Sequence, residues 1–188
     1  MKYPAEHYTR EECLSLLEAC GDSWVGLRNK ALITIMWRAG LRLSEALALR
    51  PVDIDWTAKT IRVLHGKGDK ARTVGIDEGG LEVIKTYLNN TDHVFKVTDL
   101  LLITRDGGPI DQSYVRTMLP RIATKAGVHK RVHAHGFRHT FAVDLLRERV
   151  PMVHIQRLLG HSSLATTSVY LASLSPEEAL DAVRSRVW

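Results

Sequence analysis

The sequence predicts a mainly α-helical domain with one small antiparallel β-sheet, an α+β fold. Apolar residues recur at helical spacing along most of the chain, and the spacing changes to the alternation typical of strands only between residues 53 and 76. The chain has 188 residues, of which 45% are hydrophobic and 25% charged. That composition is typical of one globular domain with a core of its own.

Thr9 and Glu12 mark the start of the first helix. Their spacing is typical of a capping box, in which each side chain accepts the backbone N–H of the other residue. The apolar stripe behind this box ends at Gly21. Cys13 and Cys20 lie on the same helix, and helical rise separates their Cα atoms by roughly 10 Å. A disulfide tolerates at most about 7 Å, so we expect two reduced cysteines that pack in the core.

The next two helices end at residues that interrupt helical structure. A helix is predicted over 24–39 and is followed by Gly40, which can adopt the left-handed conformation of a helix end. A shorter helix is expected near 43–49, because the residue before Pro51 disfavours helical geometry.

The sheet is predicted from three short segments with alternating polarity. Strands at 60–65 and 71–76 are joined by a turn at 66–70, whose glycines and aspartate suit a hairpin. A first strand is expected at 53–56. Helical spacing then returns, with a loop or short strand at 100–104 and a turn at 105–109. The expected helices are 81–88, 111–126, 135–148, 152–159, one that begins near 163 and a last one from 175.

The positive charge of the chain is concentrated in one segment. The net charge is +5, from 26 Lys and Arg against 21 Asp and Glu. The segment from Arg116 to Arg149 holds eight basic residues and two acids, so it carries +6 and the rest of the chain carries −1. Such a stripe displaces the counterions that condense on phosphates, and so it favours a polyanion as partner. A solvated basic helix face is the alternative.

Membrane insertion and secretion are not indicated. No apolar run reaches the roughly 18 residues of a membrane span, and polar residues interrupt the first ten positions, where a secretory peptide is apolar. We expect a soluble, cytoplasmic protein.

Two short motifs each place a cation at a turn. Arg42 lies where a turn meets a helix start, where backbone N–H groups also favour an anion, and Glu45 can orient its guanidinium from the next turn. Lys67 stands between two glycines at the hairpin tip, where it can close over a bound backbone and donate a proton if its pKa is lowered. Taken singly, an ion-paired surface arginine and a solvated turn explain these residues at least as well.

Two further motifs lie in the C-terminal half. His135 and Arg138 are three residues apart, so on a helix they can reach one anion, the arginine as a two-pronged clamp and the histidine as a proton carrier. His161 follows Leu-Leu-Gly, and Tyr170 comes nine residues later. A tyrosine is a credible nucleophile only where something accepts its proton. Alone, Tyr170 is better explained as a half-buried helix residue.

The histidines also raise the question of a zinc site. His135 and His139 have the spacing of two ligands on one helix, with His133 and His161 as further donors. Metalloproteases with this spacing need a glutamate after the first histidine, where this chain has Gly136, and the neighbouring arginines repel a cation. We expect no metal and no cofactor.

Together, the motifs resemble those of the tyrosine recombinases, the phage integrase family. The match covers the chain from about Thr9 to Ser173, in the order of the family. It implies the fold of the family's catalytic domain, that of DNA breaking-rejoining enzymes. The residues that carry it are Arg42 in GLRLSE, Lys67 in GKGDKAR, His135 and Arg138 in HGFRH, and His161 and Tyr170 in LLGHSSLATTSVYLAS.

The resemblance implies site-specific DNA recombination, in which strands are cut and rejoined without metal ion or ATP. Tyr170 is expected to attack a backbone phosphate and form a 3′-phosphotyrosine. Arg42, Arg138 and His161 are expected to hold the phosphate oxygens and stabilise the transition state. The tyrosyl link stores the energy of the phosphodiester, so that a 5′-hydroxyl can rejoin the strand.

Further roles follow from the same resemblance. Lys67 is expected to protonate the leaving 5′ oxygen, with Lys70 as an alternative that only the family pattern disfavours. His135 is expected to accept the proton of Tyr170, and Glu45 to support the first arginine.

Double-stranded DNA is the expected partner, with self-association into a tetrameric synapse on DNA and a monomer in isolation. Charge and location alone recommend four residues as contacts to the DNA. They are Lys70, Arg72, Arg116 and Arg131.

The family also suggests a domain organisation. Residues 1–174 correspond to the catalytic domain, and 175–188 to a C-terminal helix that relatives dock onto a neighbouring protomer; packing on its own domain is the alternative. The N-terminal DNA-binding domain of the family is expected to be absent, as in an excised domain, a truncated relic or a naturally short member. We therefore expect weak, salt-sensitive binding to DNA.

Two other functions share part of this reasoning. An enzyme similar to type IB topoisomerases uses the same residue types and would relax supercoiled DNA without a recombinant product. A DNA-binding module without catalysis would have no need of Tyr170 or Lys67. The recombinase is the leading interpretation.

Overall fold

The structure confirms the mainly helical fold with a small sheet. It is a computed structural model that describes residues 7–64, 71–91, 93, 95–96 and 99–160. Within these residues the elements follow one another as α1 (Arg10–Ala19), α2 (Trp24–Arg38), α3 (Leu43–Leu47), the 3₁₀ turn η1 (Pro51–Asp53), β1 (Ile54–Asp55), β2 (Thr60–Val63), β3 (Arg72–Gly75), α4 (Glu78–Asn89), α5 (Gln112–Lys125), α6 (Ala134–Arg147) and α7 (Met152–Leu159).

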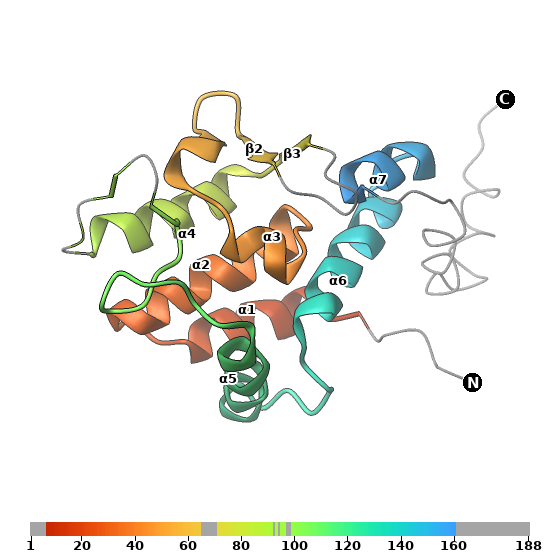
Figure 1. The fold of residues 1–188 in the computed structure, drawn as a ribbon. Helices are drawn as coiled ribbons and strands as arrows, with labels where there is room; N and C mark the ends of the chain where they lie inside the picture. The colour runs from red at the N-terminus through yellow and green to blue at the C-terminus, as the bar shows by residue number, and fades with distance from the viewer. Residues whose placement is uncertain (1–6, 65–70, 92, 94, 97–98, 161–188) are drawn as a thin grey trace, which may run out of the picture.

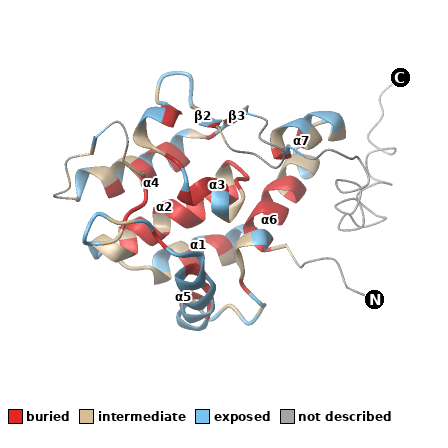
Figure 2. Cartoon of the chain, in the orientation of Figure 1, coloured by how far each residue is buried: buried red, intermediate tan, exposed pale blue. Residues whose placement is uncertain are grey.

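Helix α2 forms the centre of the core. Helices α1, α4 and α6 pack against it, and Figure 2 shows it buried along most of its length (Figures 1 and 2). A helix that is apolar on nearly all sides needs neighbours on every face. Five of its side chains are at most 1% exposed: Ala31, Leu32, Ile33, Ile35 and Met36.

The predicted capping box starts α1. The side chain of Thr9 accepts the N–H of Glu12, and the carboxylate of Glu12 accepts the N–H of Thr9 at 2.7 Å. Both cysteines are unpaired, as expected; Cys13 is buried, and Cys20 caps the end of the helix.

The three strands form an antiparallel sheet in the order β1-β2-β3. Ile61 of β2 lies opposite Ile54 on one side and Val74 on the other, and all three side chains are buried. The strands are shorter than predicted. The first is reduced to two residues, because η1 already occupies 51–53. The hairpin tip at 65–70 lies outside the described residues.

Helix α4 begins three residues earlier than expected. Its first turn contains Gly79 and Gly80, which hide the helical pattern. The side chain of Asp77 accepts the N–H of Gly80 at 2.7 Å, and this cap stabilises the first turn despite the glycines.

Two other segments also differ in length from the prediction. Helix α3 ends two residues before the predicted end. The segment at 100–104 forms only an isolated bridge between Ile103 and Pro109.

Helices α6 and α7 share a small apolar cluster of their own. It contains Phe141 and Ala142 from α6 and Ile155 and Leu159 from α7. Helix α7 has the predicted bounds and ends at Gly160, whose φ of +61° is left-handed. The helices expected after Gly160 lie outside the described part of the chain. No helix in the described part is long and apolar enough to cross a membrane.

Candidate active site

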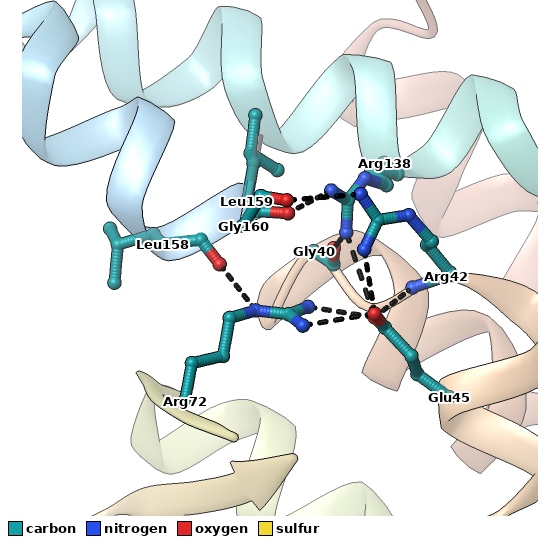
Figure 3. Close-up of polar contacts among 8 residues, drawn as sticks. All are labelled: Gly40, Arg42, Glu45, Arg72, Arg138, Leu158, Leu159 and Gly160. Atoms are coloured by element: carbon teal, nitrogen blue, oxygen red, sulfur yellow. Dashed lines mark hydrogen bonds and ion pairs between the residues drawn. The ribbon is translucent and has the colours of Figure 1, made fainter. Parts of the chain in front are cut away.

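One buried carboxylate, that of Glu45, holds arginines from three parts of the chain (Figure 3). Its Oε1 accepts from Nη1 of Arg42 at 2.7 Å and from Nη1 of Arg72 at 2.9 Å. Its Oε2 accepts from Nη2 of Arg72 at 2.7 Å and lies 3.7 Å from Nη1 of Arg138. These arginines come from the start of α3, from β3 and from α6. Side chains distant in sequence thus converge on one acid, and we call Glu45 and the three arginines the arginine cluster.

The turn between α2 and α3 positions Arg42 and Glu45. Arg42 is the residue that caps α3, and its backbone N–H donates to Oε2 of Glu45 at 2.8 Å. Gly40 reverses the chain with a φ of +65°, and its carbonyl accepts from Nη1 of Arg138 at 2.7 Å. A Cβ on Gly40 would lie 2.3 Å from Cδ1 of Phe141. Glycine therefore allows α6 to approach this turn closely.

The C-terminal end of α7 completes the surroundings of the cluster (Figure 3). Three successive carbonyls accept from the three arginines: Leu158 from Nε of Arg72 at 2.8 Å, Leu159 from Nη2 of Arg138, and Gly160 from Nη2 of Arg42 at 3.4 Å. The last carbonyls of a helix lack partners within the helix and carry the negative end of its dipole, so cations stabilise them. The residue that precedes His161 in sequence is thereby held at the cluster.

The cluster carries a surplus of positive charge. Burial acts to raise the pKa of Glu45, but the hydrogen bonds from Arg72 and then those from Arg42 outweigh it and lower that pKa to about 2. Glu45 is therefore ionised at neutral pH, and one negative charge faces three guanidinium groups. The exposed fraction of the side chain is 26% for Arg42, 11% for Arg72 and 1% for Arg138. The surplus suits an anion that approaches from the side of Arg42.

His135 lies near the same charges, at the surface on the first turn of α6. Desolvation of its ring, and then the charges of Arg138, His133 and Arg42, lower its pKa below the ordinary value of 6.5. Its imidazole is thus neutral at pH 7 and able to accept a proton. His133 caps the helix, and its Nδ1 accepts the N–H of Gly136 at 3.1 Å.

The structure brings four of the predicted site residues into one region: Arg42, Glu45, His135 and Arg138. Four others lie outside the described residues: Lys67, Lys70, His161 and Tyr170.

Arg72 takes a position that differs from the one expected of a DNA contact. Both its Nη atoms and its Nε are engaged by Glu45 and Leu158, and its side chain is largely buried. Sequence reasoning missed this role, although a signal was present. Residues two apart in a strand share a face, and Arg72 alternates in step with Val74 and Ile76, which are buried.

Arg116 and Arg131 are the remaining described residues among the four predicted DNA contacts. Both are exposed, and both line a hollow of about 540 Å³ between α5 and the loop before α6. The hollow is also lined by Lys130 and His129 and by apolar side chains such as Leu119. This face is therefore cationic, as the charge pattern predicted.

Among the residues that the structure describes, no group of three or more His, Cys, Asp or Glu side chains is arranged to hold a metal ion.

Comparisons with known proteins agree with the motifs. The model of the phage integrase family matches residues 6–176. Tyrosine recombinase XerC of Xanthomonas axonopodis pv. citri is 35% identical over 165 residues, which cover 85% of this chain and 52% of that protein. XerC of Halalkalibacterium halodurans is 37% identical over 177 residues, which cover 90% and 58%. The chain spans about half the length of these curated relatives.

Solved structures of recombinases are also similar to this chain. A crystal structure of XerA recombinase matches with a TM-score of 0.82 and 27% identity, over 100% of this chain and 68% of that one. XerH site-specific recombinase, bound to a palindromic difH substrate in a post-cleavage complex, matches with a TM-score of 0.79 and 30% identity, over 98% and 54%. The chain therefore belongs to the phage integrase family, as a tyrosine recombinase catalytic domain.

Proposed function

We propose that this chain is the catalytic part of a cytoplasmic site-specific recombinase that cuts and rejoins double-stranded DNA through a 3′-phosphotyrosine, with neither metal ion nor ATP. The observation that carries the proposal is the arginine cluster around Glu45, which joins Arg42 and Arg138 in one positively charged site. A phosphodiester carries one negative charge and gains more in the transition state of phosphoryl transfer. Fixed guanidinium groups with a surplus positive charge supply the matching stabilisation.

The reaction is a transfer of one phosphoryl group in each direction. The hydroxyl oxygen of Tyr170 forms a bond to phosphorus while the bond to the 5′ oxygen breaks. His135, whose pKa is lowered, takes the proton of Tyr170, and Lys67 gives a proton to the departing 5′ oxygen. Arg42, Arg138 and His161 hold the non-bridging oxygens. The reverse reaction with the 5′-hydroxyl of another strand rejoins the DNA.

The partner in this proposal is double-stranded DNA. The relative XerH is bound to a palindromic difH substrate in its crystal structure. Arg116 and Arg131 contact the backbone from the cationic hollow. We further propose that monomers assemble into a tetramer on the DNA, with residues 1–174 as the catalytic domain and 175–188 docked on a neighbouring protomer.

A covalent adduct tests the proposal. The chain selects a binding site from a pool of random duplexes, and the selected site is then supplied with a nick that lets the cleaved end diffuse away. After denaturing electrophoresis, the wild type gives a protein–DNA band, and Tyr170→Phe gives none. Tyr114→Phe is the matched control, because Tyr114 is a 38% exposed tyrosine of α5 outside the cluster; it retains the band.

Two results contradict the proposal. A band that survives in Tyr170→Phe means another nucleophile. Relaxation of a supercoiled plasmid without any recombinant product favours a topoisomerase activity instead.

A further inference from the structure

Arg72 connects Glu45 to the C-terminal end of α7. Its two Nη atoms donate to the two carboxylate oxygens of Glu45, at 2.9 and 2.7 Å, in a forked arrangement. Its Nε donates to the carbonyl of Leu158 at 2.8 Å. One planar side chain thus joins the acid that orients Arg42 to the end of α7, and it does so from β3 (Figure 3).

The contact requires an arginine. A guanidinium offers donors in a fixed fork that matches a carboxylate, whereas the ammonium of a lysine is a single point charge. A lysine at this position therefore cannot bind both oxygens of Glu45 and the carbonyl of Leu158 in the same plane. The close fit extends to Gly160, where a Cβ would lie 3.3 to 3.4 Å from Cδ, Nε and Nη1 of Arg72.

Loss of the contact with Arg72 would release the carboxylate of Glu45 from its present orientation. Arg72 supplies the strongest of the interactions that lower the pKa of Glu45, and it fixes both carboxylate oxygens. Without Arg72, the carboxylate is free to rotate toward Arg138, from which it is now 3.7 Å away. It would then draw Arg138 and Arg42 out of the arrangement that faces a phosphate.

We propose that Arg72 is a positioning residue for the cleavage reaction: it fixes Glu45 and the end of α7, and through them it sets the orientation of Arg42 and Arg138 toward the scissile phosphate. Each of its three guanidinium nitrogens donates a hydrogen bond to Glu45 or to Leu158. This inference rests on the proposed function and adds to it a residue that acts without touching the DNA.

Cleavage and binding respond differently to changes at Arg72. Misplacement of a reacting group by about 1 Å costs on the order of 100-fold in rate, so Arg72→Ala lowers the single-turnover cleavage rate about 100-fold. Arg72→Lys keeps the charge but not the fork, and it lowers the rate about tenfold. The affinity for the same duplex, measured by filter binding, stays within about twofold for both variants.

Arg62→Ala is the matched control. Arg62 lies on the neighbouring strand β2, is 57% exposed and forms an ion pair with the buried Asp53 at 3.6 Å. The control keeps both cleavage and binding. If Arg72→Lys cleaves at the rate of the wild type, charge alone is sufficient and the inference is overturned. It is overturned as well if cleavage and affinity fall together in Arg72→Ala, because Arg72 then contacts the DNA directly.

A neutral scissile linkage separates positioning from loss of folding. When a methylphosphonate replaces the scissile phosphate, the charge that Arg42 and Arg138 hold is removed. The defect of Arg72→Ala relative to the wild type then shrinks to less than about tenfold. A defect that stays at 100-fold on the neutral linkage indicates general disruption of the structure and overturns the inference.

Inorganic phosphate gives a readout that does not depend on cleavage. The Nε–H resonance of Arg42 shifts during a phosphate titration of the wild type, and Arg72→Ala binds phosphate at least fivefold more weakly. If the wild type forms no covalent adduct but this difference is found, the proposed function fails, whereas the contact by which Arg72 positions Arg42 for a bound phosphate is supported. Equal affinities, or no binding by the wild type, overturn the inference.

Discussion

Replacing Glu45 with glutamine tests whether one carboxylate holds the arginine cluster together. The pKa of Glu45 is about 2, against an ordinary value of 4.5, and each unit corresponds to about 1.4 kcal/mol. The residue is 4% exposed, so solvent does little to weaken these interactions. We expect Glu45→Gln to lower the free energy of unfolding by about 3 kcal/mol at pH 7. Glutamine also turns one acceptor into an N–H group that faces the arginine donors.

The pH dependence of this loss has a defined sign. Because the pKa is lower in the folded state, the contribution of Glu45 is complete above pH 4.5 and is lost as the pH falls toward 2. Urea unfolding, followed by circular dichroism, should show about half the difference between wild type and variant at pH 3 that it shows at pH 7. Glu82→Gln, which removes an exposed carboxylate paired with Lys85, is the control and should show no measurable change. A loss at pH 7 below about 1 kcal/mol, or one that is equal at both pH values, would show that the ionised carboxylate does not hold the cluster together.

Three further variants test other parts of the fold by urea unfolding. Gly40→Ala should cost about 2 to 4 kcal/mol, because φ is +65° and the new Cβ meets Phe141; a neutral result would show that α6 can move away. Burial, and then the charge of His7, lowers the pKa of His139 to about 4. Stability should therefore fall by about 3 kcal/mol between pH 6.5 and pH 4, and His139→Gln should flatten that slope; an unchanged slope would assign it to other groups. Thr9→Ala should cost about 1 kcal/mol through loss of the cap, and no loss would mean that the box is dispensable.

Local signals predicted much of the fold. Residues that act within one helical turn were sufficient to predict the capping box of Thr9 and Glu12, the turn at Gly40 and the bounds of α7. The start of α4 was missed, since two glycines mask a helix that the cap of Asp77 stabilises. Short-range signals are therefore sufficient to predict which helices and strands form, but not where some of them begin or end.

The arginine cluster could be predicted only in part. Arg42 and Glu45 are three residues apart, so their ion pair follows from helical spacing. The approach of Arg72 and Arg138 to the same carboxylate depends on how β3 and α6 pack, and a single sequence carries no direct signal for that packing. The alternation of Arg72 with buried residues indicated an inward side chain, but not its partner.

In the proposed reaction, Arg138 acts on a scissile phosphate from within the cluster. This role of Arg138 can be measured by comparing DNA cleavage and DNA affinity in Arg138→Ala with the wild type, at a temperature where circular dichroism shows both to be folded. The control is Arg50→Ala, since Arg50 also pairs with a buried carboxylate, that of Asp53, but lies outside the cluster. In Arg138→Ala, cleavage should fall by about 100-fold or more while affinity falls less than about fivefold, with neither changed in the control. Equal losses of cleavage and affinity in Arg138→Ala would instead make this arginine an anchor for DNA with no role in the cleavage step.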